Sequence, residues 1–285
     1  MRTDDADLVI TADSVYELLG TAFRVRSTSA GTGDAVASLF GGFSTPEQPV
    51  PSARCFVVVD ECGRHGGGMC IHVGGRPVTR PGGLGPVLSW LLAEMNAAAI
   101  ESYDGFAVHA GAVAAAGQVT AFPGESGRGK TTLVTAALRA GLDYVSDEAL
   151  CVDPLSRNVI AYPRPLDLSP ESLRLTGLAD RGVGTPVATG ALVAPASIEA
   201  RVAGPPLVLA GVVRPVRRAG PPVLTMVNRS QAMAWLLEFS FNHYKRPEES
   251  FRLAAALARQ ATAWTLEYDD PLAAGALLRR HADRQ

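Results

Sequence analysis

The stretch that decides the fold is QVTAFPGESGRGKTTLVTAALRAG, residues 118–141. Its centre, residues 124–131, matches the pattern G-x-x-x-x-G-K-[ST] without a mismatch. The apolar run 118–123 before the pattern predicts a strand, and the run 130–140 after it predicts an amphipathic helix that ends at Gly141. A strand, a glycine loop and a helix in this order are typical of a loop that binds phosphate, whereas the alternative is a chance glycine turn. The chain is therefore expected to be an α/β protein that binds a nucleotide.

Each residue type in this loop has a chemical reason. Gly127 and Gly129 let the backbone turn with its N–H groups pointing inward, and the helix N-terminus adds its partial positive charge. Lys130 is expected to reach the β- and γ-phosphates of ATP, Thr131 to bind Mg²⁺, and Thr132 to contact the α-phosphate. ATP is expected rather than GTP because no guanine-reading N/T-K-x-D pattern occurs. The predicted nucleotide contacts are Gly124, Glu125, Ser126, Gly127, Arg128, Gly129, Lys130, Thr131 and Thr132.

An acidic pair, Asp147 and Glu148, ends the next predicted strand, residues 144–146. The carboxyl ends of strands in an α/β sheet collect at one edge, so these acids are expected beside Lys130. Two carboxylates there could bind Mg²⁺ and accept a proton from an attacking hydroxyl. The alternative is a solvated turn. We therefore predict that Thr131, Asp147 and Glu148 are the metal ligands.

His109 and Arg164 are further candidates for the site. His109 is expected to end a strand, residues 106–109, before the hairpin that leads into the glycine loop, where it could touch the γ-phosphate or the acceptor, or be structural. Arg164 stands between two prolines and could steady a transferring phosphoryl group, or be a surface arginine. The predicted catalytic residues are Asp147, His109, Lys130 and Arg164.

Three segments together resemble the HPr kinase/phosphorylase superfamily: His109-Ala-Gly-Ala-Val, the loop 124–132, and residues 139–148, which close with the acidic pair. The chain looks closer to the short HPr-kinase-like proteins of biosynthetic gene clusters, such as lasso-peptide precursor kinases. Glu148 stands where that superfamily usually has aspartate, and the later Glu-x-Arg-Gly-Leu-Gly signature of the bacterial regulators has no match here. The resemblance covers the chain well only across 109–148.

This resemblance implies a P-loop kinase domain of the HPr-kinase or carboxykinase type, which uses Mg²⁺ and ATP and phosphorylates a serine hydroxyl. By matching position it implies that Asp147 is the general base and that His109 assists at the phosphate. The implied partner is a peptide or protein acceptor, and the family suggests a homo-oligomer. A small-molecule kinase stays open as an alternative, and so does an ATPase or nucleotide switch that has no phospho-acceptor.

Two regions are expected along the chain. Residues 1–102 carry no phosphate-binding pattern and read as a mixed, β-rich accessory region that would hold the acceptor, and residues 103–285 read as the kinase domain. In the first region we predict a helix after Pro86 and a loop over 31–51. The predicted strands there are 8–11, 22–25, 55–59 and 69–73.

The rest of the second region is expected to alternate strands with helices. We predict two separate strands over 106–116, a strand pair around the turn at Asp153, and a mobile loop over 178–204. The predicted strands beyond it are 208–215, 223–227 and 264–268. The predicted helices run from 228 or 230 to 242, over 248–263, and from Asp270 onward.

Composition and the N-terminal residues predict no binding to nucleic acid or to anionic membranes, and no secretion. The chain has 285 residues, 47% of them hydrophobic, and a net charge of −2, so no basic field is available for nucleic acid or an anionic membrane. The N-terminus lacks the pattern of a secretory signal, and a cytoplasmic location is expected. The four cysteines are too few and too scattered for a disulfide scaffold. A zinc site could be drawn from Cys55, Cys62, His65, Cys70 and His72, but their spacing is uncommon, and a hairpin that turns over 63–68 is favoured.

Overall fold

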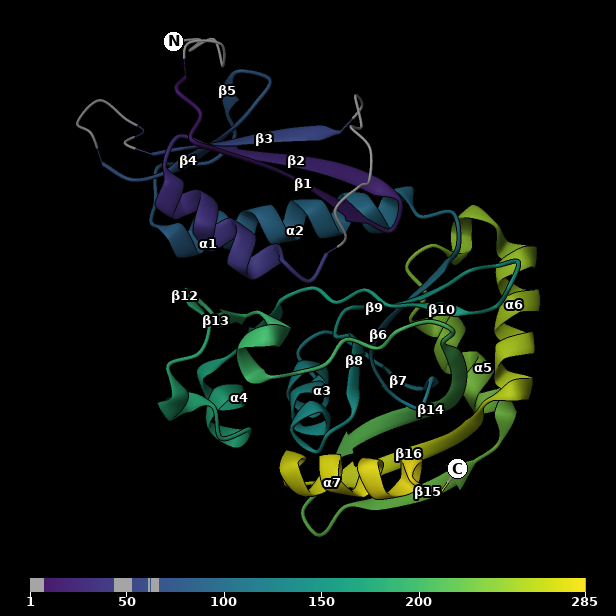
Figure 1. Cartoon of the computed structure of the whole chain (residues 1–285). Helices are drawn as coiled ribbons and strands as arrows, with labels where there is room; N and C mark the ends of the chain where they lie inside the picture. The colour runs from purple at the N-terminus through teal and green to yellow at the C-terminus, as the bar shows by residue number, and fades with distance from the viewer. Residues whose placement is uncertain (1–7, 44–52, 61, 63–66, 285) are drawn as a thin grey trace.

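The computed structural model describes residues 8–43, 53–60, 62 and 67–284 and is a mixed α/β structure (Figure 1). A five-stranded sheet in the order β1-β2-β3-β4-β5 forms the N-terminal part. Helices α1 and α2 cover the face of this sheet that looks toward the rest of the molecule (Figure 1). The bounds are β1 (Ala12–Leu18), β2 (Thr21–Ser27), α1 (Ala30–Phe40), β3 (Arg54–Val59), β4 (Cys70–Val73), β5 (Arg76–Pro77) and α2 (Leu84–Ser102).

Two predictions for this part are wrong. Residues 30–40 form helix α1 rather than a loop, because Ser29 caps it and Val36, Leu39 and Phe40 bury one face in the core. The glycines in its first turns hid that periodicity; residues 44–51 of the predicted loop lie outside the described part. The predicted strand 8–11 is also wrong, since β1 begins at Ala12.

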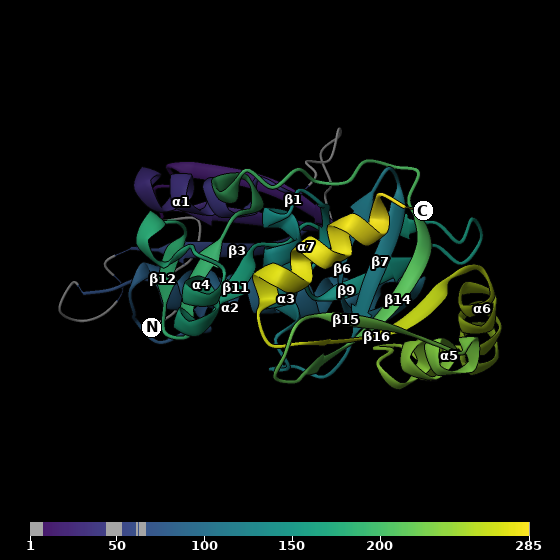
Figure 2. The same ribbon diagram turned by 90° about the horizontal axis from the view of Figure 1, so that it is seen from below.

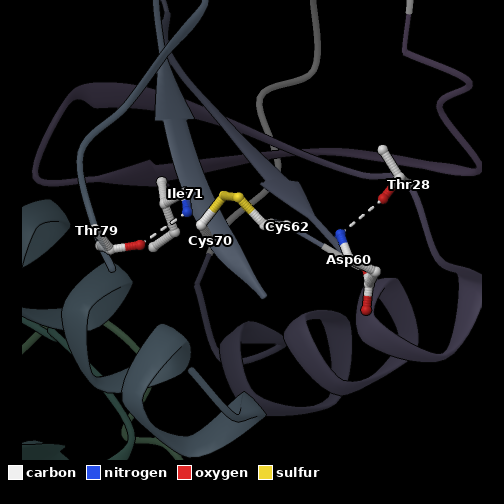
Figure 3. Close-up of a disulfide and its surroundings, with 6 residues drawn as sticks. All are labelled: Thr28, Asp60, Cys62, Cys70, Ile71 and Thr79. Atoms are coloured by element: carbon white, nitrogen blue, oxygen red, sulfur yellow. Dashed lines mark hydrogen bonds between the residues drawn. A yellow bond between two sulfur atoms is a disulfide. The ribbon is translucent and has the colours of Figure 1, made fainter. Parts of the chain in front are cut away.

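The antiparallel pairing predicted for β3 and β4 is confirmed. A disulfide joins Cys62 to Cys70 at the start of β4, and the cysteine spacing did not predict it (Figure 3). His65 and most of the predicted turn lie outside the described residues.

The larger sheet has eight strands in the order β10-β9-β6-β7-β14-β16-β15, with β8 also paired to β6. Its two faces carry separate hydrophobic cores, one with α3 and α7 and the other with α5 and α6 (Figures 1 and 2). The bounds are β6 (Phe106–Ala115), β7 (Gln118–Pro123), α3 (Lys130–Arg139), β8 (Asp143–Ser146), β9 (Ala149–Val152), β10 (Val159–Ile160), β14 (Val208–Arg217), β15 (Val223–Val227), α5 (Arg229–Glu238), α6 (Pro247–Gln260), β16 (Thr262–Tyr268) and α7 (Pro271–Ala282).

Strand β6 organises the site. It is one continuous strand, not the two that were predicted, and it lies between β7 on one side and β8 with β9 on the other. Ala112 pairs with Ser146 and His109 pairs with Ala149, so Asp147 and Glu148 interrupt the ladder between β8 and β9. Because β7 and β8 both run antiparallel to β6, their carboxyl ends meet at one edge of the sheet, as predicted.

The mobile loop predicted over 178–204 is also wrong. This run contains strands β12 and β13, which form a three-stranded sheet with β11 in the order β11-β13-β12. Gly190 explains the close pairing, because it has φ +143° and an added Cβ would lie 2.0 Å from the Leu168 carbonyl oxygen. The bounds are β11 (Leu166–Leu168), α4 (Pro170–Leu175), η2 (Ala179–Arg181), β12 (Thr185–Val187), β13 (Gly190–Val193), η3 (Pro195–Ile198) and η4 (His243–Lys245).

The predicted C-terminal elements exist, and β15 has the predicted bounds, whereas the others differ at one end or both. Helix α5 ends at Glu238 rather than at 242, and the Phe241 N–H donates to the Ala107 carbonyl oxygen of β6. Helix α6 ends at Gln260 rather than at 263, because the next residues enter β16 beside β14. The strand pair β9 and β10 and the cap of α7 by Asp270 are confirmed.

The N-terminal part packs directly on the larger sheet. Phe43 stacks on Tyr162 at 5.9 Å between ring centroids, and the Tyr162 hydroxyl donates to Asn96 Oδ1 at 2.9 Å. The N-terminal hydrophobic core also includes Ala107 of β6 and Cys151 of β9. Among the described residues, no helix is long and apolar enough to cross a membrane.

Candidate active site

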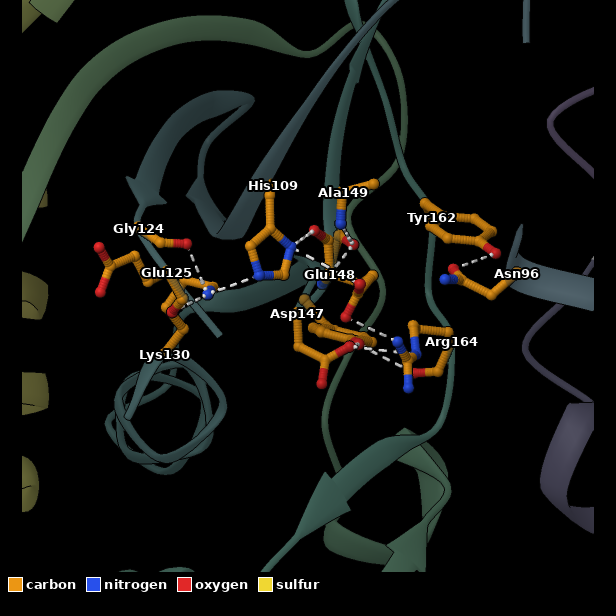
Figure 4. Close-up of polar contacts among 12 residues, drawn as sticks. Asn96, His109, Gly124, Glu125, Lys130, Asp147, Glu148, Ala149, Tyr162 and Arg164 are labelled. Atoms are coloured by element: carbon orange, nitrogen blue, oxygen red, sulfur yellow. Dashed lines mark hydrogen bonds and ion pairs between the residues drawn. The ribbon is translucent and has the colours of Figure 1, made fainter. Parts of the chain in front are cut away.

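The glycine loop joins β7 to α3 at the sheet edge described above. Gly127 and Gly129 have φ angles of +77° and +84°, a region that other residues rarely adopt. Lys130 begins α3 and is only 5% exposed. Its Nζ donates to the carbonyl oxygens of Gly124 at 2.8 Å and Glu125 at 2.7 Å (Figure 4). Burial lowers the pKa of Lys130 to about 8.

His109 lies within β6 rather than at the end of a strand, between the loop and the acidic pair. Its Nε2 is 2.9 Å from Lys130 Nζ, and its Nδ1 is 3.2 Å from the Glu148 carbonyl oxygen (Figure 4). Since the ammonium can only donate, Nε2 is assigned as the acceptor, and Nδ1 carries the proton. Burial and the Lys130 charge lower the pKa of His109 and so favour the neutral ring, although the Glu148 carboxylate acts in the opposite direction.

Asp147 is 3% exposed, so the alternative of a solvated turn is wrong for this residue. The Tyr144 hydroxyl donates to its Oδ1 at 3.1 Å, and Arg164 Nε lies 3.6 Å from the same oxygen. Burial raises the pKa of Asp147 to about 6, although Arg164 acts in the opposite direction. The carboxyl group is thus a stronger base than an exposed aspartate.

Arg164 joins the two acids. Its Nη1 donates to Glu148 Oε2 at 2.9 Å, and it also pairs with Asp147 (Figure 4). The residue is 8% exposed, so the alternative of a surface arginine is wrong. Although burial opposes it, Asp147 and Glu148 together raise the pKa of Arg164, and the guanidinium stays charged.

A cavity of about 380 Å³ separates the loop from the acids. The predicted catalytic residues all line it, and so do the predicted metal ligands: Asp147, His109, Lys130, Arg164, Thr131 and Glu148. A hydroxyl and two carboxylates are donors that suit a hard cation such as Mg²⁺. Thr132 also lines the cavity, but its hydroxyl lies 2.7 Å from Ser172 Oγ of α4.

A second hollow, of about 670 Å³, also borders the loop. It shares Gly127, Gly129 and Lys130 with the first cavity and extends to the end of β14 at Arg217. The predicted contacts Glu125 and Arg128 line this second hollow and form an exposed ion pair at 2.9 Å. Gly124 also lines the second hollow, whereas Ser126 lines the first cavity.

Sequence reasoning missed Asp167, Ser169 and Ser172, which line the first cavity from β11 and α4. No local pattern marks them, because β11 is brought to the site by its pairing with β13. No residue of 1–102 that the structure describes lines either cavity. The acceptor-holding role of that region stays a prediction.

Comparison with known proteins adds no family to this geometry. No protein-family model matches the chain, and no curated protein matches it. The resemblance noted from the residues therefore stays a prediction.

Proposed function

We propose that this protein is an ATP- and Mg²⁺-dependent kinase that transfers the γ-phosphate to a serine or threonine hydroxyl of a peptide or protein. One observation carries the proposal: a glycine loop with a buried lysine faces a buried carboxylate of raised pKa across a single cavity. The fold and acceptor class follow the HPr-kinase-like resemblance of segments 109–148. Phosphoryl transfer depends mainly on positioning and charge stabilisation, which the glycine loop, Lys130 and the acidic pair would supply.

The two hollows around the loop suggest how ATP would lie. The loop N–H groups, Lys130 and Thr131 would hold the phosphates, with the γ-phosphate toward Asp147 and the nucleoside toward the hollow at Arg217. Lys130 would exchange the Gly124 and Glu125 carbonyls for phosphate oxygens. Mg²⁺ bound by Thr131 and the acidic pair would neutralise phosphate charge.

Asp147 is the proposed general base. With a pKa of about 6 it is largely ionised at neutral pH and still basic enough to take a proton from an acceptor hydroxyl. Arg164 would hold both carboxylates in place through its contacts of 3.6 and 2.9 Å. His109, neutral and bonded to both Lys130 and the Glu148 carbonyl, would orient the ammonium toward the phosphate.

A nucleotide switch or ATPase is the second candidate. It is favoured by the absence of any described residue of 1–102 from the cavity lining, because an acceptor site there would have been expected. Transfer is favoured because Asp147 faces the space where an acceptor hydroxyl would lie, and a positioned base accelerates that step. The two candidates differ in one observable, namely whether ATP consumption needs an acceptor.

The experiment combines ATP consumption with intact-mass measurement of candidate peptide acceptors, including those encoded beside the gene. Asp147→Asn should bind ATP normally and lose at least roughly a hundredfold in transfer. Asp104→Asn is the matched control, because that carboxylate is 93% exposed. A phosphorylated peptide that is absent only with Asp147→Asn would support the kinase. Acceptor-independent ATP loss would favour the ATPase, and failure to bind ATP would refute the loop assignment.

A further inference from the structure

The N-terminal sheet carries a cluster that the proposed kinase chemistry does not use. The ligand atoms of Cys62, Cys70 and His72 all lie within 4.8 Å of one another. In the structure the two sulfurs form a disulfide. We propose that, once this disulfide is reduced, Cys62, Cys70 and His72 bind a zinc ion, so that the bound metal and the disulfide are alternative states of one site.

The donor set suits zinc. Two thiolates and an imidazole are soft to borderline ligands, which Zn²⁺ accepts in tetrahedral geometry. With Zn–S near 2.3 Å and Zn–N near 2.0–2.1 Å, ligand atoms around the ion stand about 3.5–3.8 Å apart. All three ligand atoms already lie within 4.8 Å of one another, so after reduction short side-chain movements that separate the two sulfurs would be enough to seat the ion. Three protein ligands leave the fourth position to water.

The backbone holds these ligands in place. Cys70 and His72 are two residues apart on β4 and therefore point to the same face of the sheet. Their partners on β3 are Val59 and Val57, and Val57 is buried, which gives the site an apolar wall. Such a shell strengthens the interaction of a cation with thiolates.

Hydrogen bonds fix the backbone at Cys62 and at residues next to the two cysteines. The Ile71 N–H, between the two β4 ligands, donates to Thr79 Oγ1 at 2.9 Å, and the Asp60 N–H donates to Thr28 Oγ1 at 2.9 Å (Figure 3). The Cys62 N–H donates to the Gly68 carbonyl oxygen at 2.9 Å, which keeps Cys62 beside β4. Cys62 is only half-buried, whereas Cys70 and His72 are buried, so a metal ion would enter from the Cys62 side.

The two states are related by a balanced reaction. An external dithiol breaks the Cys62–Cys70 bond, supplies two electrons and two protons to give two thiols, and is itself oxidised to a disulfide. Zinc binding then displaces the two thiol protons to solvent, so the affinity for zinc rises with pH. In a reducing compartment such a cysteine pair more often binds metal than forms a disulfide.

The test uses the full chain and zinc alone, and it does not depend on kinase activity. Protein reduced by a dithiol under anaerobic conditions, and protein left oxidised, are titrated with Zn²⁺ against a chelating dye. Cobalt is then substituted to detect thiolate-to-metal absorption. We expect one zinc per reduced chain and none per oxidised chain. Losing a ligand should cost at least about a hundredfold in affinity, since losing even outer partners costs 10–100-fold.

Cys62→Ser is the main variant because Cys62 is half-buried and its replacement should preserve the fold, which circular dichroism checks. Cys151→Ala, in the larger sheet, is the matched control that also removes one thiol. His72→Ala should weaken zinc binding by the reduced protein, and the oxidised variant should still bind no zinc. The proposal is overturned if reduced wild type binds no zinc, or if Cys62→Ser or His72→Ala binds it as wild type does.

Discussion

Asp147 carries a stability cost that one substitution should remove. Its carboxyl group is 3% exposed, and burial raises its pKa from 3.8 to about 6. One pKa unit corresponds to about 1.4 kcal/mol, so ionised Asp147 should lower the free energy of unfolding by about 3 kcal/mol at pH 8. Because the pKa of Asp147 is higher in the folded state, this residue costs no stability below pH 3.8, where its carboxyl group is protonated. The free energy of unfolding then falls as pH rises through about 6, where the folded carboxyl group ionises.

An asparagine side chain at this position would resemble a permanently protonated carboxyl group, so Asp147→Asn should avoid this cost. The same linkage relation gives a cost of roughly 1–2 kcal/mol at pH 5 and about 3 kcal/mol at pH 8. The variant should therefore be more stable than wild type, by roughly 1–2 kcal/mol more at pH 8 than at pH 5. Its phosphoryl transfer should be almost abolished.

Urea unfolding followed by tryptophan fluorescence at the two pH values, at equal ionic strength, measures this increment; the chain has three tryptophans. The exposed carboxylate Asp104 again supplies the control, since Asp104→Asn should change stability by less than about 0.5 kcal/mol at either pH. A stability difference for Asp147→Asn that is equal at pH 5 and pH 8 would refute the reasoning. So would a variant less stable than wild type at pH 8, because the Arg164 ion pair would then outweigh burial.

Three further predictions concern the site and its support. Lys130→Ala should remove most of the affinity for ATP in calorimetry, and wild-type affinity should fall from pH 7 to pH 9 as a lysine of pKa about 8 loses its charge. Arg164→Met should raise the pKa of Asp147 by about 1–3 units and move the acid limb of the transfer rate to higher pH; an unmoved limb would contradict the ion pair. Gly111→Ala should destabilise the fold by about 1–3 kcal/mol in urea, because its Cβ would lie 2.6 Å from a valine methyl of α3, whereas Gly204→Ala, with open space, should not.

Much of the glycine loop could be predicted because it is a local feature of the chain. The glycines, Lys130 and the flanking strand and helix are neighbours in the chain, and the positive φ angles at Gly127 and Gly129 follow from that pattern. The meeting of Asp147 with this loop could also be predicted, since it needs only the rule that strand ends share an edge. Strand β6 pairs with both β7 and β8, so only one strand lies between the two ends that meet.

Other features depended on partners distant in the chain. Helix α1 was not predicted because glycines interrupt its hydrophobic pattern, and burial against the N-terminal sheet stabilises it. Strands β12 and β13 form because β13 also pairs with β11. His109 was predicted at a strand end, but β6 continues through it, because β9 pairs with 106–109 and β7 pairs with 110–115. Propensity alone is a weak guide where such pairing decides the outcome.

Short-range spacing and hydrophobic period were enough to predict the glycine loop, the acidic pair and the α/β class of this protein. Long-range packing was needed to bring Arg164 to both Asp147 and Glu148, to bring Asp167 and Ser172 to the cavity, and to join Cys62 to Cys70. The physical reason is that burial and ion pairing are properties of the packed chain. The pKa of a carboxyl group, and so its chemistry, depends on what the fold brings to it.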